Sequence, residues 1–237
     1  MNNVVLLLTV ALLVFSCNKA TEKQPEQMAG FIHEGFLLES GDILFQDIDC
    51  GPFCESIETV TFGVEGAKFS HVGILVSNGE GEYVILEAVS AGVKETAIDS
   101  FFMRSHDAEN RSKVVVGRMK SEHAQLIPEA ITFAYSKLGA AYDEVFDISN
   151  DKYYCSELIY ESFKHANDGV PIFELQPMTY KDPETDELFP IWTDYFDELN
   201  VPVPEGEPGL NPGGMSKSPY LEIVHFFGKP QGYTGEL

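Results

Sequence analysis

Cys155 is the residue of this sequence that is best placed to act as a nucleophile. It lies near the start of residues 154–166, where apolar residues recur on one face at helical spacing, so we predict a helix that begins beside the thiol. The positive end of a helix dipole stabilises a thiolate, which is the reactive form of cysteine. Because a cysteine in apolar surroundings is more often simply packed in the core, a catalytic interpretation requires a base close to it.

A histidine could supply that base, and His71 is the strongest candidate among the six in the chain. It directly precedes the apolar run 72–76, so we expect it at the start of a β-strand, where a sheet can hold an imidazole in a fixed position. The alternative is a half-buried histidine that bonds only to the backbone. The other histidines fall in less suitable places: the tether (His33), charged loops (His106, His123), the polar end of a helix (His165) and the middle of a strand (His225).

A carboxylate could orient this imidazole. Glu87 is the one acidic residue in the apolar segment 84–89, and burying a carboxylate there is costly unless it is paired. The sequence Asn-Gly-Glu-Gly at 78–81 joins this strand to the strand of His71 as a hairpin. We therefore expect Glu87 and His71 on neighbouring strands.

The register of this hairpin decides whether the two side chains meet. Pairing of Val76 with Glu82 places the carboxylate directly across from the imidazole, on the same face of the sheet. Pairing of Val76 with Tyr83 turns the carboxylate to the other face, as a diagonal neighbour. The first register completes a set of thiol, imidazole and orienting carboxylate. The alternative to this catalytic interpretation is a cross-strand ion pair of Glu87 on a solvated face of the sheet.

The remaining patterns predict an α+β domain. Strands that are mostly adjacent in the sequence, with two helices set apart from them, indicate an antiparallel sheet packed against helices. The nine prolines within residues 171–219 predict a long irregular excursion over the surface. The predicted strands cover residues 41–46, 69–76, 83–89, 113–119 and 221–227, and the predicted helices cover 128–138 and 154–166.

The N-terminus is typical of a lipoprotein signal peptide. Residues 4–15 are an apolar run of about a dozen residues, which is shorter than the roughly 20 needed to cross a bilayer. Ser16 and Cys17 complete a lipobox, which predicts cleavage after residue 16 and a lipid on the Cys17 thiol. Since no Lys or Arg precedes the apolar run, an ordinary cleaved signal is the alternative.

These patterns divide the chain into three segments. Residues 1–16 form the signal peptide, residues 17–35 the lipidated cysteine and a flexible polar tether, and residues 36–237 a single domain. The formal net charge of −23 argues against nucleic acid as a partner, because phosphate binding needs clustered Lys and Arg. We expect a monomer in the cell envelope, held by its lipid and facing the periplasm or the surface of the outer membrane.

Cys50 and Cys54 could pair with each other. They lie within disulfide reach if the chain between them curls into a helix, and an exported protein tolerates such a bond. Together with a histidine they could instead ligate zinc, although the four-ligand spacing of a structural zinc site is absent from the sequence. We expect neither a metal nor another cofactor. A disulfide here would leave Cys155 as the unpaired thiol.

Four motifs taken together resemble a known family. They are GDILF at residues 41–45, SHVGI at 70–74, EA at 87–88 and YCSEL at 154–158, in this order along the chain. The order is similar to that of the YiiX/YebB-like permuted papain-like amidases, relatives of the NlpC-type cysteine peptidases, in which the histidine strand precedes the cysteine helix. The resemblance covers roughly residues 38–166 and implies a circularly permuted papain-like fold.

The resemblance also implies a role for each candidate residue. Cys155 corresponds to the nucleophile, His71 to the general base and Glu87 to the residue that orients this base. The implied activity is hydrolysis of an amide or ester through an acyl-enzyme, with peptides, including those of the cell wall, or lipid-linked amides as substrates. Tyr142 resembles a residue of the family's polar loop and is a candidate oxyanion or substrate contact. The side-chain amide of Gln46, at a strand end, could also donate to an oxyanion.

Two other functions would use the same residues. An acyltransferase would form the same acyl-thioester and pass the acyl group to an acceptor other than water, and the sequence offers no acceptor site that separates the two enzymes. A binding lipoprotein would keep the fold without turnover, and the complete set of Cys155, His71 and Glu87 argues against it.

Overall fold

The structure is a computed structural model that describes residues 30–236. The predicted signal peptide, the predicted lipidation of Cys17 and most of the predicted tether lie outside the described residues. In the part of the chain that the structure describes, no helix is long and apolar enough to cross a membrane.

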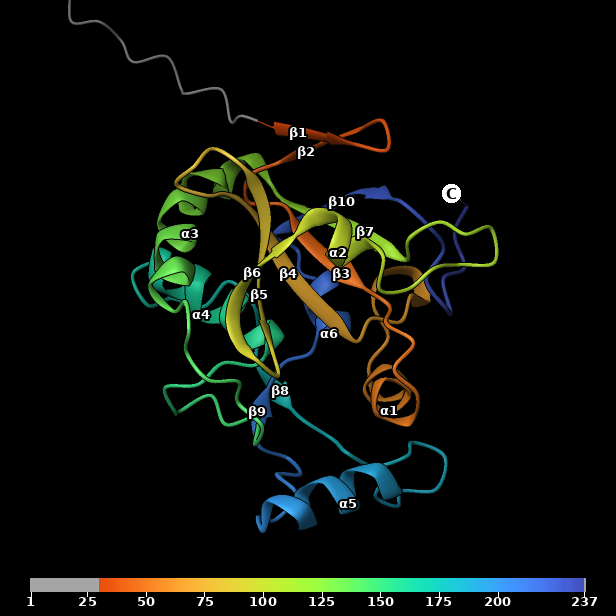
Figure 1. Cartoon of the computed structure of the whole chain (residues 1–237). Coiled ribbons are helices and arrows are strands. Elements are labelled where there is room, and N and C mark those ends of the chain that lie inside the picture. The colour runs from red at the N-terminus through yellow and green to blue at the C-terminus, as the bar shows by residue number, and fades with distance from the viewer. Residues whose placement is uncertain (1–29, 237) are drawn as a thin grey trace, which may run out of the picture.

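A six-stranded antiparallel sheet forms the centre of the fold, in the order β10-β7-β3-β4-β5-β6 (Figure 1). It contains every predicted strand and one more, β6, whose sequence GVKETA hides the strand pattern because Lys and Glu occupy its middle. The bounds are β3 Ile43–Gln46, β4 His71–Ser77, β5 Tyr83–Val89, β6 Gly92–Ala97, β7 Val114–Met119 and β10 Leu221–Phe226.

One face of the sheet packs against the two predicted helices. These are α3 (Ile127–Ser136) and α4 (Cys155–Ala166), which contact each other, and α4 also lies on β4 and β5. Val72 and Ile74 of β4 point into this layer, where they are fully buried together with Phe163 of α4. The period-two alternation of apolar residues in β4 thus fixes which strand residues face the cysteine helix.

The opposite face carries a smaller apolar layer. Leu75 and Ile85 pack there against α2 (Ile98–Phe102), a short helix whose two phenylalanines are buried. β1 (Gly30–His33) and β2 (Phe36–Glu39) form a hairpin at the edge of this layer (Figure 1). The two turn residues between them have positive φ, as in a tight two-residue hairpin turn. The last residues of the segment expected to be a tether, 30–35, therefore belong to this hairpin.

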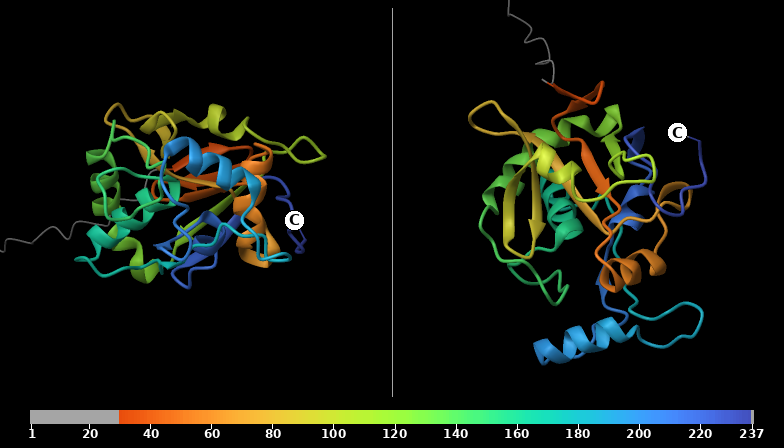
Figure 2. Two further views of the ribbon diagram at one scale, coloured as in Figure 1. Left: turned by 90° about the horizontal axis from the view of Figure 1, so that it is seen from below. Right: turned by 45° about the vertical axis from the view of Figure 1, so that its right-hand side comes forward.

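The proline-rich segment is more regular than the sequence predicts. It contains the short paired strands β8 (Gln176–Pro177) and β9 (Pro208–Gly209) and two helices, α5 (Pro190–Leu199) and α6 (Pro212–Ser216). The prediction of an irregular excursion is wrong for these parts because both helices begin with a proline, where its missing N–H costs nothing. Helix α5 lies apart from the sheet, beside α1 (Figure 1 and Figure 2).

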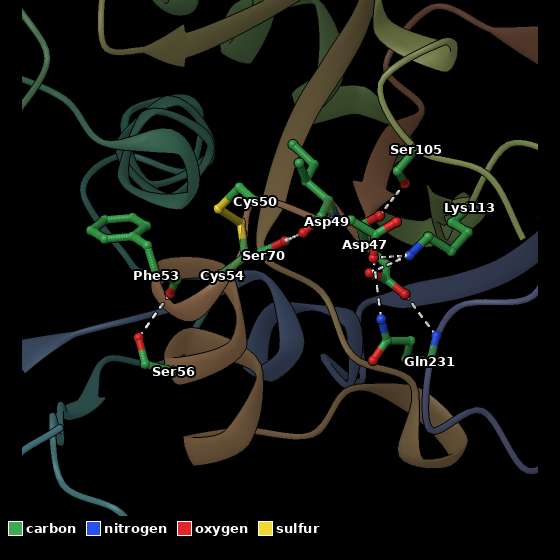
Figure 3. Close-up of a disulfide and its surroundings, with 11 residues drawn as sticks. Asp47, Asp49, Cys50, Phe53, Cys54, Ser56, Ser70, Ser105, Lys113 and Gln231 are labelled. Atoms are coloured by element: carbon green, nitrogen blue, oxygen red, sulfur yellow. Dashed lines mark hydrogen bonds and ion pairs between the residues drawn. A yellow bond between two sulfur atoms is a disulfide. The ribbon is translucent and has the colours of Figure 1, made fainter. Parts of the chain in front are cut away.

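Helix α1 (Pro52–Val60) begins inside a disulfide loop. Cys50 and Cys54 are bonded, with Cα atoms 5.3 Å apart, and the bond joins the strand-side loop to the first turn of the helix (Figure 3). The hypothesised disulfide is confirmed, and both sulfurs are thereby withdrawn from the alternative zinc site. Phe53, between the two cysteines, packs on Trp192 of α5 with ring centroids 4.7 Å apart.

A buried ion pair ties the C-terminal segment to the sheet. The Lys113 ammonium donates to Asp47 at 2.9 Å and to Asp49 at 2.7 Å, and the Gln231 backbone N–H donates to the other oxygen of Asp47 at 2.7 Å (Figure 3). Lys113 and Asp47 are almost completely buried. An uncompensated charge at such a depth is strongly destabilising. The buried ammonium of Lys113 and the buried carboxylate of Asp47 therefore depend on each other.

We predict that Lys113→Met lowers the free energy of unfolding by about 3–5 kcal/mol, because it leaves the Asp47 carboxylate buried without a cation. Urea denaturation measures this loss. The control is Lys164→Met, which removes an ion pair to Glu161 on the surface of α4 and should cost less than about 1 kcal/mol. Equal losses in the two variants would contradict the structural role of Lys113.

Candidate active site

Cys155 is the first residue of α4, and it is the free cysteine among the described residues. The helix starts here because an oxygen of the Glu157 carboxyl group accepts a hydrogen bond from the backbone N–H of Tyr154 at 3.1 Å, which caps the helix. Leu158 and Phe163 anchor the following turns in the core. The thiol is thus held at the positive end of the helix, and only 8% of the residue is exposed.

His71 is the first residue of β4, and the sheet fixes its position. It lies opposite Gln46 of β3, and the backbone N–H of Ser70 donates to the Gln46 carbonyl at 3.0 Å. His71 lines the same cavity as Cys155 and is 8% exposed. The structure therefore brings the predicted nucleophile and the predicted base together, one from a helix and one from a strand.

The hairpin of β4 and β5 adopts a register that neither predicted alternative describes. Val76 lies opposite Val84, which makes Glu87 a diagonal neighbour of His71 on the same face. The two side chains nevertheless meet, with His71 Nε2 2.5 Å from Glu87 Oε2. Gly73 lies opposite Glu87, and a Cβ atom there would lie 2.5 Å from Ile85 Cγ2 and 3.3 Å from Glu87 Cβ, so the side chains of β5 leave no room for a larger residue at this position. The predicted register is wrong, but the predicted pairing of imidazole and carboxylate is present.

The Glu87 carboxylate is fully buried and accepts hydrogen bonds from three side chains. Besides His71, the Thr96 hydroxyl of β6 donates to Oε1 at 2.5 Å, and the Arg104 guanidinium donates to both oxygens, at 2.8 Å to Oε2. Sequence reasoning missed Thr96 and Arg104. The cost of burying Glu87 indicated a partner, but no spacing pointed to Arg104, which follows the unpredicted helix α2.

These contacts set the charge of both groups. Burial would raise the pKa of Glu87, but Arg104 and His71 outweigh it and lower this pKa to about 2. Since a carboxylate only accepts hydrogen bonds, the proton shared with His71 belongs to Nε2. Burial would lower the pKa of His71, whereas the nearby Cys155 and Glu87 raise it to about 9. An imidazolium at neutral pH is the partner that a thiolate at Cys155 requires.

Glu157 does not oppose this charge distribution. Burial raises the pKa of its carboxyl group to about 9, with further contributions from nearby acidic groups that include Asp143. Burial thus favours the uncharged form of Glu157 at neutral pH. An uncharged carboxyl group can still cap the helix, because its oxygen accepts the hydrogen bond from Tyr154 N–H.

Two donors could stabilise an oxyanion at Cys155. The backbone N–H of Cys155, in the first turn of α4, has no acceptor within the helix. Tyr142 lines the same cavity, and burial, with a contribution from Cys155, raises the pKa of its phenol well above the ordinary value, so the hydroxyl stays a donor. Gln46 does not serve this purpose, because its fully buried side-chain amide donates to the Phe101 carbonyl at 2.7 Å.

A cavity of about 930 Å³ opens beside the cysteine and the histidine. Its walls come from the disulfide loop and α1, from the start of α4, and from the segment that contains α5 and α6. Glu87 lies behind His71 and does not line the cavity. A substrate in this space could therefore reach the thiol and the imidazole, while the carboxylate stays shielded from it.

Comparisons with known proteins identify relatives of this chain. Residues 37–225 match a family described as permuted papain-like amidase enzymes, the YaeF/YiiX or C92 family. The chain is 26% identical over 186 residues to protein YiiX of Escherichia coli K12, covering 78% of this chain and 85% of that protein. It also shares its fold with a crystal structure of the metalloprotein YiiX from Escherichia coli O157:H7, at a TM-score of 0.61 and 24% identity, covering 79% of this chain and 96% of the other.

Within residues 30–236, no group of three or more His, Cys, Asp or Glu side chains is arranged to hold a metal ion.

We predict that iodoacetamide modifies Cys155 of the mature protein rapidly at mildly acidic pH, because the His71 imidazolium persists up to about pH 9 and favours a thiolate. His71→Ala should slow this reaction and make its rate rise with pH, as for an ordinary thiol with a pKa of about 8.5. Peptide mapping by mass spectrometry follows the modification. Equal, slow labelling of Cys155 in both proteins would show that His71 does not activate it.

Proposed function

The chain belongs to the family of permuted papain-like amidases, and from that premise we propose that it is a cysteine hydrolase that cleaves an amide bond through an acyl-enzyme. The observation that carries the proposal is the contact between His71 and Glu87, 2.5 Å long, behind a cavity that His71 shares with Cys155. A thiol at a helix start, an imidazole and an orienting carboxylate are the parts of a cysteine nucleophile.

The first half of the reaction would form the acyl-enzyme. The Cys155 thiolate attacks the substrate carbonyl carbon, and the developing oxyanion accepts hydrogen bonds from the Cys155 N–H and from Tyr142. Nε2 of His71 is held by Glu87, which leaves Nδ1 to donate its proton to the amine nitrogen. The C–N bond breaks, the amine leaves, and the acyl group remains on the sulfur as a thioester.

The second half would release the acid. Neutral His71 accepts a proton from a water molecule, and the oxygen attacks the thioester carbon. The C–S bond breaks, the Cys155 thiolate leaves, and His71 is again an imidazolium. Glu87 stays charged throughout, because its pKa of about 2 lies far below that of His71.

We predict that Glu87→Gln lowers turnover by roughly 10-fold to 1,000-fold, because the imidazolium of His71 loses the charge that stabilises it. If Glu87 only formed a surface ion pair, which contributes about 0–1 kcal/mol, turnover would stay nearly unchanged. Cys155→Ser and His71→Ala should lower turnover further. Turnover is measured with peptide amides and acyl amides as test substrates, and mass spectrometry identifies the products.

The double variant tests whether these residues act as a unit. Glu87→Gln combined with His71→Ala should be little worse than His71→Ala alone, because effects within one catalytic unit are not additive. If the double variant showed the full product of the two losses, Glu87 would act independently of His71, and its assigned role would have to be abandoned.

We further propose that the protein works in the cell envelope, anchored by a lipid on Cys17. The support is the lipobox of the sequence, in which an apolar run of signal-peptide length ends at Ser16 and Cys17. Such a location would give the hydrolase access to cell-wall peptides and to lipid-linked amides.

Expressed in a bacterium that is fed an alkyne-tagged fatty acid, the protein should acquire the tag and sediment with membranes. Cys17→Ala should abolish both, because it removes the thiol that takes the lipid, whereas Cys155→Ala should retain both. Tagging of Cys17→Ala at the level of the wild type would show that the anchor lies elsewhere.

A further inference from the structure

Arg104 binds the carboxylate that orients His71, and the proposed reaction gives it no part so far. Its guanidinium donates to both oxygens of Glu87, at 2.8 Å to Oε2, the oxygen that His71 Nε2 also contacts. A guanidinium that bonds to both oxygens of a carboxylate fixes the orientation of that carboxylate. Arg104 therefore holds Glu87 in place, and its positive charge lies close to the imidazole.

The position of Arg104 is fixed by its own surroundings. Its guanidinium carbon lies 5.0 Å from the centre of the Phe101 ring, in a cation–π contact. Phe101 is fully buried in α2, its carbonyl accepts a hydrogen bond from the Gln46 amide, and its ring centre lies 6.0 Å from that of His71. The Arg104 side chain is 25% exposed, so water screens its charge only in part.

The charged and titratable groups around His71 come from three sides. Glu87 of β5 meets the imidazole at Nε2, Arg104 lies behind Glu87, and Cys155 of α4 lies on the cavity side. Lys94, the residue of β6 opposite Glu87, is exposed to solvent. During the proposed reaction Glu87 and Arg104 keep their charges, whereas the charge on Cys155 disappears when its sulfur becomes a thioester.

This loss of charge creates a requirement in the second half of the reaction. The acyl-enzyme has no thiolate, and His71 must be neutral in order to accept a proton from water. A carboxylate without a second partner would favour the protonated imidazole, which cannot act as a base. The guanidinium of Arg104 opposes this effect, because it disfavours a second positive charge beside the same carboxylate.

We propose that Arg104 is a positioning residue for deacylation: it offsets the charge of Glu87, so that His71 loses its proton once Cys155 is acylated and serves as the base for water. The inference rests on the proposed amidase function and adds a role in its second half. The bond changes are those already described, and Arg104 exchanges no proton in them. It acts on the reacting atoms only through Glu87 and His71.

Titration of His71 by NMR in a protein without the thiol tests this charge effect directly. In Cys155→Ala, which lacks the thiolate as the acyl-enzyme does, the pKa of His71 should lie below that of the wild type. Adding Arg104→Met should raise this pKa by roughly two pH units, the effect of a unit charge about 5 Å away at an effective dielectric constant of about 20. Adding Glu87→Gln instead should lower it. If Arg104→Met left the pKa unchanged or lowered it, the proposal would be overturned.

A further variant leaves no buried charge without a partner and thus covers the case in which Arg104→Met does not fold. Glu87→Gln combined with Arg104→Met, in the Cys155→Ala protein, should return the pKa of His71 to near its value in Cys155→Ala alone. Arg104→Lys keeps the positive charge, so the pKa should stay near that value as well. A double variant with the same low pKa as Glu87→Gln would show that Arg104 does not act on His71.

Burst kinetics with p-nitrophenyl acetate separate the two halves of the reaction. The burst of nitrophenol reports acylation, and the steady rate that follows reports deacylation. In Arg104→Met the burst should persist, while the steady rate at neutral pH should fall by roughly 10-fold to 100-fold and recover as the pH rises, because less of His71 is neutral. The control is Arg111→Met, at a surface arginine that pairs with Asp107, which should change neither rate.

The two measurements separate this inference from the proposed function. If the wild type hydrolyses no amide but His71 responds to Arg104→Met as expected, the amidase proposal fails and the effect of Arg104 on His71 stands. If hydrolysis occurs but Arg104→Met leaves the pH dependence of the steady rate unchanged, the role of Arg104 in deacylation fails alone.

Discussion

The site depends on the burial of one carboxylate, that of Glu87. A buried charge is costly unless opposite charges and hydrogen bonds surround it, and here His71, Thr96 and Arg104 all donate to it. Arg104 balances the charge of Glu87, and His71 lies between this pair and Cys155. Arg104 acts only through Glu87 and is in this sense a positioning residue.

The topology of the sheet brings the partners of Glu87 together. His71 and Glu87 come from neighbouring strands of the sheet, Thr96 from the next strand, and Arg104 from the chain after α2 on the same face. Cys155 comes from the opposite layer, at the start of α4. Of the charge network around Glu87, only the imidazole of His71 lines the cavity, which it shares with Cys155 and Tyr142.

Local patterns predicted the elements that carry the main site residues, because those patterns are dictated by burial. The strand of residues 83–89 and the helix start at Cys155 are examples. The register of the hairpin was not predictable, since the turn residues at 78–81 are compatible with more than one loop length. The contact between Arg104 and Glu87 was not predictable either, because tertiary packing, and no pattern in the sequence, brings these two residues together. Helix α5 did leave a signal, apolar residues at positions 191, 192, 195, 196 and 199, which its flanking prolines obscured.

The ionisation of His71 tests the account most directly. Titration of isotope-labelled histidine by NMR, with His71→Ala to assign the resonances, should give a pKa of about 9 for His71 in the wild type, above the ordinary value of 6.5. In Glu87→Gln the pKa should fall markedly, because the imidazolium loses its counter-charge and faces Arg104. A pKa near 6.5 in both proteins would contradict the central role of Glu87.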